Sequence, residues 1–236
     1  ITLNAGGGTF NSNGTNSTLS GNITGTGDFT KTGVGIVTLS GTNSFLGDVA
    51  INGGSLQVSS DANLGDAANA LTLDGGTLRL GAATTLAREI TLGAGNGGVD
   101  TNGFNTTLSE IIDGAGSLTK SGTGILTLTG ANTYSGGTIV STGTLRGNTV
   151  SIQGNVTTNA ALEFDQSTDD TFADNIDGTG SLTKSNTGEL TLTGTNTYSG
   201  GTTISGGKLI GNTTSIQGNI IKNAILTFNQ GTTSTY

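Results

Sequence analysis

The chain has 236 residues, of which 43 are glycine, and it lacks proline, cysteine, histidine, methionine and tryptophan. Because histidine and cysteine are missing, the chain cannot form a Ser-His-Asp or Cys-His nucleophile or any of the usual zinc ligand sets. Eight lysines and arginines against 16 aspartates and glutamates give a net charge of −8, which argues against nucleic acid and anionic lipid as partners.

Strand-sized runs of alternating apolar and polar residues recur along the whole sequence. Each run ends at Gly, Asn or Asp, and the runs follow one another about every eight to twelve residues. In chain order they include ITL at 1–3, SLQV at 55–58, LTL at 71–73, TLRL at 77–80, ITL at 90–92 and ILTL at 125–128. Residues 85–92 (TLAREITL) are the nearest candidate for a helix, but their Thr and Ile content favours strand. The sequence therefore predicts an all-β protein.

One block of sequence is present three times. Residues 25–56, 114–145 and 178–209 align without a gap, and similarity beyond the block extends the repeats to 25–58, 114–177 and 178–236, the last copy being truncated. Residues 1–14 retrace 90–103, so we interpret about 59–89 as inserted coils. Repetition at this scale predicts a single stacked array, because each unit buries its apolar face only against its neighbours.

Two all-β architectures compete, an antiparallel sandwich or barrel and a parallel β-helix. Five registers carry the same kind of residue in all three copies, as stacking coils require. These registers are Phe29, Leu118 and Leu182; Val37, Leu126 and Leu190; Leu39, Leu128 and Leu192; Phe45, Tyr134 and Tyr198; and Leu56, Leu145 and Leu209. We predict one right-handed parallel β-helix over 1–236, with three short strands per coil. A repeat of about 64 residues corresponds to three coils of about 21, and about eleven coils at about 4.8 Å each give a rod of about 50 Å.

Two polar positions recur in the repeats. Asn43, Asn132 and Asn196 are either inward corner amides bonded to the backbone or exposed turn residues, and the sequence leaves both readings open. Lys31, Lys120 and Lys184 are predicted to be exposed strand residues that discourage edge pairing, about 14 Å apart in the last two copies.

The densest acidic stretch is FDQSTDDTFADNIDG, with Asp165, Asp169, Asp170, Asp174 and Asp177. Such carboxylates suit a Ca²⁺ site or the acidic cluster of a polysaccharide lyase or hydrolase. In the last repeat, however, the counterparts of Asp165, Asp169 and Asp170 are Asn229, Thr233 and Ser234. We therefore expect a solvated loop. Glycine pairs such as Gly122 and Gly124 are interpreted as corner residues rather than phosphate ligands. The sequence nominates no catalytic, cofactor-binding or metal-ligating residue.

The block SLTKSGTGILTLTGANTYSGGT resembles the passenger-associated strand repeat of autotransporters, the type V secreted proteins of bacteria, and SSDANLGDAANALTLDGGTLRL from Ser59 supports this resemblance. The resemblance implies a β-helical passenger exported to the cell surface or the medium. It does not imply an activity, because adhesins, proteases and lipases share this repeat. Neither a signal peptide nor a membrane barrel is recognisable, so we expect a passenger fragment.

Three functions follow from these observations. The favoured hypothesis is a non-enzymatic surface stalk or adhesin scaffold that contacts a host-cell or cell-surface receptor or glycan. The second hypothesis is a subunit that stacks end to end into a filament or surface layer. The third is a β-helix that binds or cleaves polysaccharide through acidic residues on one flank. The fold class, the absence of cofactors, and the exclusion of nucleic acid and membrane insertion are common to all three.

Overall fold

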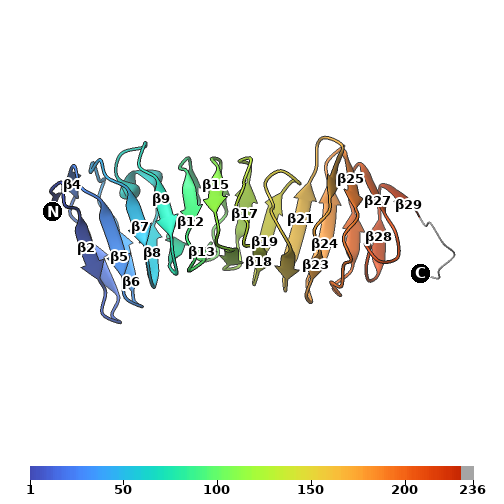
Figure 1. Cartoon of the computed structure of the whole chain (residues 1–236), viewed down its shortest axis with the longest axis horizontal. Coiled ribbons are helices and arrows are strands. Elements are labelled where there is room, and N and C mark those ends of the chain that lie inside the picture. The colour runs from blue at the N-terminus through green and yellow to red at the C-terminus, as the bar shows by residue number, and fades with distance from the viewer. Residues whose placement is uncertain (230–236) are drawn as a thin grey trace.

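The computed structural model describes residues 1–229 as a β-solenoid, with strands running across the long axis of a rod and the N-terminus at one end (Figure 1). The paired strands are parallel, as in β8–β10 and β14–β17, and each pairs with a strand about 20 residues away along the chain. Each coil passes over three sides in turn, which we call sides I, II and III. The predicted parallel β-solenoid is confirmed.

Side I begins with a six-stranded sheet and, after two irregular coils, continues in a four-stranded sheet. Its strands are β2 (Gly8–Asn11), β5 (Phe29–Thr32), β7 (Val49–Ile51), β9 (Leu71–Leu73), β12 (Ile90–Leu92), β15 (Ile112–Gly114), β22 (Asp170–Phe172), β25 (Glu189–Leu192), β27 (Lys208–Gly211) and β29 (Ile225–Phe228). We place β22 on this side because it follows a strand of side III and precedes one of side II.

Side II is a nine-stranded sheet followed by two irregular coils. Its strands are β3 (Ser17–Leu19), β6 (Ile36–Leu39), β8 (Ser55–Val58), β10 (Thr77–Leu80), β13 (Gly97–Asp100), β16 (Leu118–Ser121), β18 (Thr138–Val140), β20 (Val156–Thr158) and β23 (Ile176–Asp177). Nine strands and the two irregular stretches amount to about eleven coils, the number predicted.

Side III starts with a strand pair and a short 3-10 helix and continues in an eight-stranded sheet. Its elements are β1 (Thr2–Leu3), β4 (Thr24–Gly25), η1 (Asp61–Leu64), β11 (Thr84–Leu86), β14 (Thr106–Leu108), β17 (Ile125–Leu128), β19 (Thr144–Gly147), β21 (Ala161–Asp165), β24 (Ser181–Ser185), β26 (Thr202–Ile204) and β28 (Ile220–Lys222).

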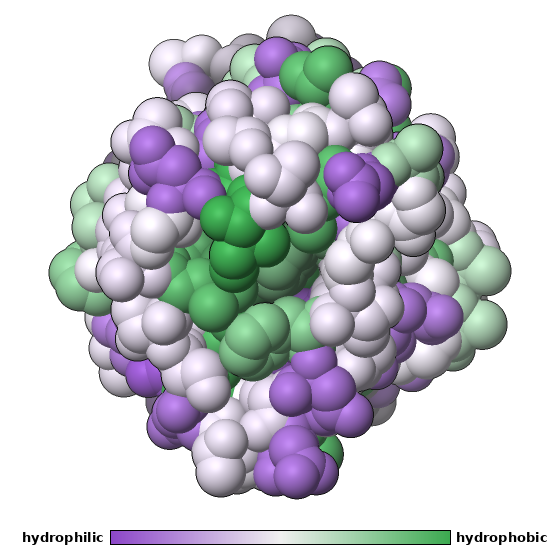
Figure 2. All heavy atoms as spheres, turned by 90° about the vertical axis from the view of Figure 1, so that its left-hand side faces the viewer, coloured by the Kyte–Doolittle hydropathy of each residue, from purple (hydrophilic) through white to green (hydrophobic). Residues whose placement is uncertain are grey.

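The core is a column of inward side chains enclosed by the three sides. Leu126 and Leu128 are buried while Thr127 between them is half-buried and faces outward, as the two-residue period of a strand requires. All five predicted apolar registers are buried. Seen from the N-terminal end, apolar surface fills the centre of the rod and polar surface surrounds it (Figure 2).

Not every side of every coil is a strand, in contrast to the prediction of three strands per coil. In each repeat, the third side is irregular in two successive coils. The irregular stretches are 43–46 with η1, 132–135 with 148–153, and 196–199 with 212–217. Backbone hydrogen bonds still connect them to the preceding coil, for example from Ser44 N to Ile23 O (2.8 Å) and from Thr133 N to Ile112 O (2.9 Å). Asparagine side chains complete the pairing at these places.

Successive repeats are rotated about the rod by one side. Strands β5, β16 and β24 open the three copies, and they lie on sides I, II and III. From Leu118 of β16, three coils end at Ile176 of β23, but the equivalent residue Leu182 comes six residues later, on the next side. The expectation that one repeat equals three whole coils is therefore wrong. Coils here are shorter than 21 residues, so a repeat takes three coils and one further side.

Candidate functional site

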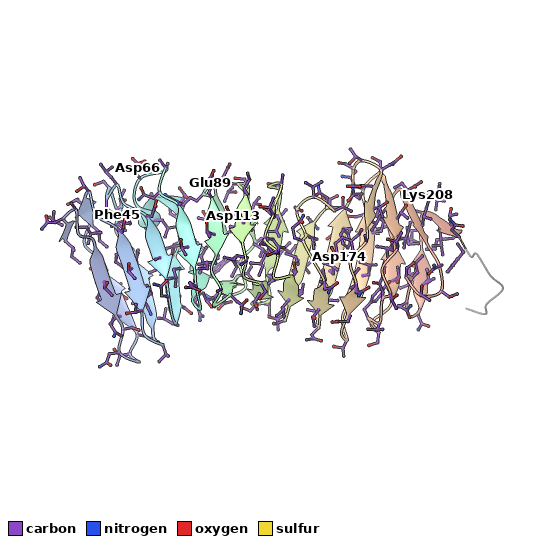
Figure 3. The ribbon with its side chains drawn as sticks, viewed as in Figure 1. Phe45, Asp66, Glu89, Asp113, Asp174 and Lys208 are labelled. Carbon is purple, nitrogen blue, oxygen red and sulfur yellow. The ribbon has the colours of Figure 1, made fainter. Side chains whose placement is uncertain are left out.

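The acidic stretch does not form one cluster. Asp165 is half-buried, whereas Asp169, Asp170, Asp174 and Asp177 are exposed. Asp169 Oδ1 accepts a hydrogen bond from Glu189 N of the following coil at 2.7 Å. In the described part of the chain, no three acidic side chains come together as a metal site would require. Labelled acidic residues elsewhere, such as Asp66 and Asp113, are likewise spread along the rod (Figure 3).

Asp170 accepts hydrogen bonds from the Thr149 hydroxyl and from Thr171 N. These two bonds, the first more than the second, hold the pKa of Asp170 below its usual range. Asp170 therefore stays ionised at neutral pH and has no character of a general acid. Of the counterparts in the last repeat, Asn229 is described and Thr233 and Ser234 lie outside the described residues.

The three repeated lysines, Lys31, Lys120 and Lys184, are fully buried, so the prediction that they are exposed is wrong. Each follows the inward apolar residue of its strand by two positions, and the strand period turns it to the same side. We call the oxygens around each ammonium group the lysine cage.

In its cage, Lys120 Nζ donates to the carbonyls of Ser121 (2.8 Å) and Gly122 (2.6 Å) in its own coil. It also donates to the Thr101 hydroxyl (3.1 Å) in the preceding coil and to the Thr142 carbonyl (3.0 Å) in the following coil. One side chain thus connects three successive coils.

The same arrangement recurs in the other copies. Lys31 Nζ reaches the Ser12 hydroxyl at 3.1 Å in the coil before and the Gly53 carbonyl at 3.0 Å in the coil after. Lys184 reaches the Gly206 carbonyl at 3.2 Å. Within residues 1–229, no salt bridge includes any of these lysines. Backbone dipoles, rather than carboxylates, surround the buried charge.

Burial sets the acid–base behaviour of the cages. It lowers the pKa of Lys120 to about 8, and the nearby Asp100 carboxylate opposes that shift. Burial also lowers the pKa of Lys31, and of Lys184 against the opposing charges of Asp165 and Asp169. The cages lie inside the rod with their hydrogen bonds made to the backbone, so we interpret them as structural elements rather than ligand sites.

The repeated asparagines are inward corner amides, one of the two readings that the sequence left open. Asn43, Asn132 and Asn196 are buried. Asn132 Oδ1 accepts from Ile112 N at 2.8 Å and its Nδ2 donates to Ser151 O at 2.6 Å. Each such amide replaces a missing strand ladder by bonding to the coil before and the coil after.

The aromatic position beside these asparagines has two chemical versions. Tyr134 donates or accepts a hydrogen bond with the Thr138 hydroxyl at 2.8 Å, and Tyr198 does so with Thr202 at 2.7 Å. In the first repeat, the two equivalent residues are Phe45 and Val49, which are both apolar and buried. The polar pair and the apolar pair thus change together, because a buried hydroxyl without a partner is unfavourable.

Arg88 is a buried charge that sequence reasoning missed. It lies between β11 and β12 and forms a two-point ion pair with Asp61 of η1, with N–O distances of 2.8 and 3.0 Å. Its remaining nitrogen, Nη1, donates to two carbonyls of the loop after η1, Asp66 O at 2.6 Å and Asn69 O at 3.1 Å. The alternation of Leu86, Arg88 and Ile90 is the signal that places it inward.

The outer surface of side III carries a ladder of threonines. Paired strands place Thr85, Thr107, Thr127 and Arg146 in adjacent outward positions. A groove of about 410 Å³ lies over them, also lined by Asn105 and Ile125. Arg146 Nε donates to Glu163 Oε2 at 2.9 Å in the next coil.

Comparison with known proteins agrees with this architecture. The passenger-associated-transport-repeat family matches residues 29–58, 118–146 and 182–210, the three copies of the block. The chain is 41% identical over 172 residues to the adhesin BmaC autotransporter of Brucella suis biovar 1 (strain 1330). The aligned part is 71% of this chain and 5% of that relative, so the chain spans a small fraction of the relative's length. No solved structure matches.

Within residues 1–229, no helix is long and apolar enough to cross a membrane. The repeat matches include the caged lysines and the corner asparagines in all three copies. The chain therefore belongs to the passenger domains of autotransporters that are built from passenger-associated transport repeats, and it lies at the bacterial cell surface or outside the cell.

Proposed function

We propose that this chain is a non-enzymatic part of an adhesin, a stiff surface stalk whose outer faces contact a host-cell or cell-surface receptor or glycan. The observation that carries the proposal is the continuous parallel stack, in which polar Thr and Ser side chains face outward and the buried charges of Lys31, Lys120 and Lys184 connect successive coils. The similarity to an autotransporter named as an adhesin supports the same role.

The chemistry of the chain supports the non-enzymatic part of the proposal. Its sequence has no histidine or cysteine, and the carboxylate of Asp170 stays ionised at neutral pH. General acid–base catalysis would therefore need another carboxylate or a lysine with a shifted pKa, and the lysines with lowered pKa values are enclosed in their cages.

Surface display tests the adhesive role. Residues 1–236 are fused to a membrane anchor in a non-adherent bacterium, and bacteria bound to cultured cells are counted. We expect more binding than with the anchor alone and than with an unrelated β-helix of equal length. Equal binding of all three would contradict the proposal.

The polysaccharide and filament hypotheses stay predictions, and each has its own test. Cleavage of polysaccharide that disappears in the double variant Asp169→Asn, Asp170→Asn would favour an enzyme. End-to-end stacking would give particles whose mass rises with concentration, as light scattering would detect.

A further inference from the structure

The groove on side III has a repeating polar floor, and three of its hydroxyls have no partner within residues 1–229. In residues 1–229, the hydroxyls of Thr85, Thr107 and Thr127 make no hydrogen bond with another protein group. Neighbouring coils place these hydroxyls about 4.8 Å apart, so the row from Thr85 to Arg146 spans about 14 Å. Each hydroxyl is both a donor and an acceptor for a ligand.

The charge of the groove is balanced. Arg146 is its cation, and Glu163 of the next coil pairs with it at 2.9 Å. Both carboxylate oxygens of Glu163 are engaged, because Ser185 donates to Oε1 at 2.7 Å. Nε of Arg146 is used in the pair, and the remaining guanidinium nitrogens have no protein partner within residues 1–229. These nitrogens are available to donate hydrogen bonds to a neutral ligand, because Glu163 already neutralises the charge of Arg146.

Asn105 and Ile125 form one wall of the groove, which is partly polar and partly apolar. Asn105 Oδ1 accepts from Ile125 N at 2.9 Å, which fixes the amide and leaves its Nδ2 without a protein partner in the described chain. A smaller hollow of about 100 Å³ continues beyond Arg146 toward Asn148 and Asp165. The groove is therefore open along the rod rather than a closed pocket.

We propose that this groove binds an extended, uncharged polyhydroxyl chain, a neutral linear glycan lying along the rod axis. Such a chain offers donors and acceptors at short regular intervals, as the threonine row does. The compensated Arg146 and the net charge of −8 disfavour an acidic glycan. The proposal deepens the adhesive function above, on which it rests, by naming the ligand class and its location.

Binding is tested on the whole chain by NMR titration. The probes are neutral linear hexasaccharides of β-1,4-linked glucose, mannose and N-acetylglucosamine, and an oligogalacturonate of equal length as the acidic counterpart. We expect saturable shifts of groove amides with at least one neutral probe and weaker binding of the acidic probe. No saturable shift with any neutral probe, shifts that map to another face, or tighter binding of the acidic probe would overturn the proposal.

Substitutions then test the hydroxyl row. Thr107→Val and Thr127→Val keep the β-branched shape and remove one hydroxyl each, and we expect each to weaken binding about tenfold. Thr183→Val is the matched control, because Thr183 faces outward on the same ladder beyond the Arg146–Glu163 pair. Thr127→Arg, which copies the residue next along the ladder, should fill the groove and abolish binding. Loss of binding in Thr183→Val, or full binding in Thr127→Arg, would contradict the assignment.

The display assay separates the two proposals. If bacteria carrying the chain adhere, and the double variant Thr107→Val, Thr127→Val adheres equally, the groove assignment fails while the adhesive function stands. If the chain binds the neutral glycan but mediates no adhesion, the adhesive function fails while the groove assignment stands.

Discussion

Replacing Lys120 by methionine tests whether the lysine cages hold neighbouring coils together. Methionine preserves most of the side-chain length but removes the ammonium group. The carbonyl of Ser121 keeps two other donors, the amide and hydroxyl of Thr101. The carbonyls of Gly122 and Thr142 have Lys120 as their one protein donor within residues 1–229.

The expected cost follows from these two carbonyls. An unsatisfied buried acceptor costs about 1–3 kcal/mol, and because Gly122 is half-buried and Thr142 is exposed, water partly replaces the lost donor, so we take about 1–3 kcal/mol for the pair together. Removing a buried charge recovers part of this. We therefore expect Lys120→Met to reduce local stability by about 1–2 kcal/mol, confined mainly to the adjoining coils because a solenoid has nearest-neighbour contacts.

Native-state hydrogen exchange is the suitable assay, since it reports the opening of individual coils. Amides around Thr101, Lys120 and Thr142 should exchange roughly 5- to 30-fold faster than in the parent chain, as the tenfold-per-1.4 kcal/mol relation requires. Thr119→Val, at the adjacent outward position of β16, is the control and should leave exchange nearly unchanged. Unchanged exchange in Lys120→Met, or equal acceleration along the whole rod, would refute the reasoning.

Three further predictions follow from the interior. Unfolding free energy should rise from about pH 8 to 9.5, because the lowered pKa of Lys120 lets the folded chain release a proton that the unfolded chain still binds. Above about pH 10 the unfolding free energy should fall, because burial raises the pKa of Tyr134 and the folded chain keeps a proton that the unfolded chain releases. Denaturant midpoints across this range check both signs, and a fall already at pH 8–9.5 would contradict them. Tyr134→Phe should cost about 1 kcal/mol, but much less in a Thr138→Val background, as a double-mutant cycle would measure. Leu128→Ala should cost about 2–5 kcal/mol, with faster hydrogen exchange limited to the neighbouring coils.

The fold was predictable because the sequence itself shows both the alternation of apolar and polar residues and the repeated block. Leu126 and Leu128 occupy a register that any stacked strand must bury. The burial of the lysines was not predicted, because lysine is almost never fully buried without a charged partner. Lys120 stands two residues after Leu118, so its strand turns it inward, and only backbone carbonyls from three coils make that placement tolerable.

The rotation of the repeats was hidden by small differences in coil length. Strands β16, β18, β20 and β23 begin at residues 118, 138, 156 and 176, and no regular spacing in the sequence marks where a coil closes. The groove could not be predicted from the sequence either, because it depends on which outward residues of four coils become neighbours. Thr85 and Arg146 are far apart in sequence and lie on one ladder only once the register is known.

The rotation of successive repeats also has a mechanical consequence. In each copy, the irregular third side has fewer ladder hydrogen bonds than the two sheet sides, and it would be the compliant wall of that segment. If all three copies had the same orientation, these walls would form a seam down the rod, and the rod would bend most easily in that direction. Because the irregular stretches fall on sides III, I and II in turn, the compliance is distributed around the circumference. We therefore expect the bending stiffness of the rod to be similar in every direction perpendicular to its axis.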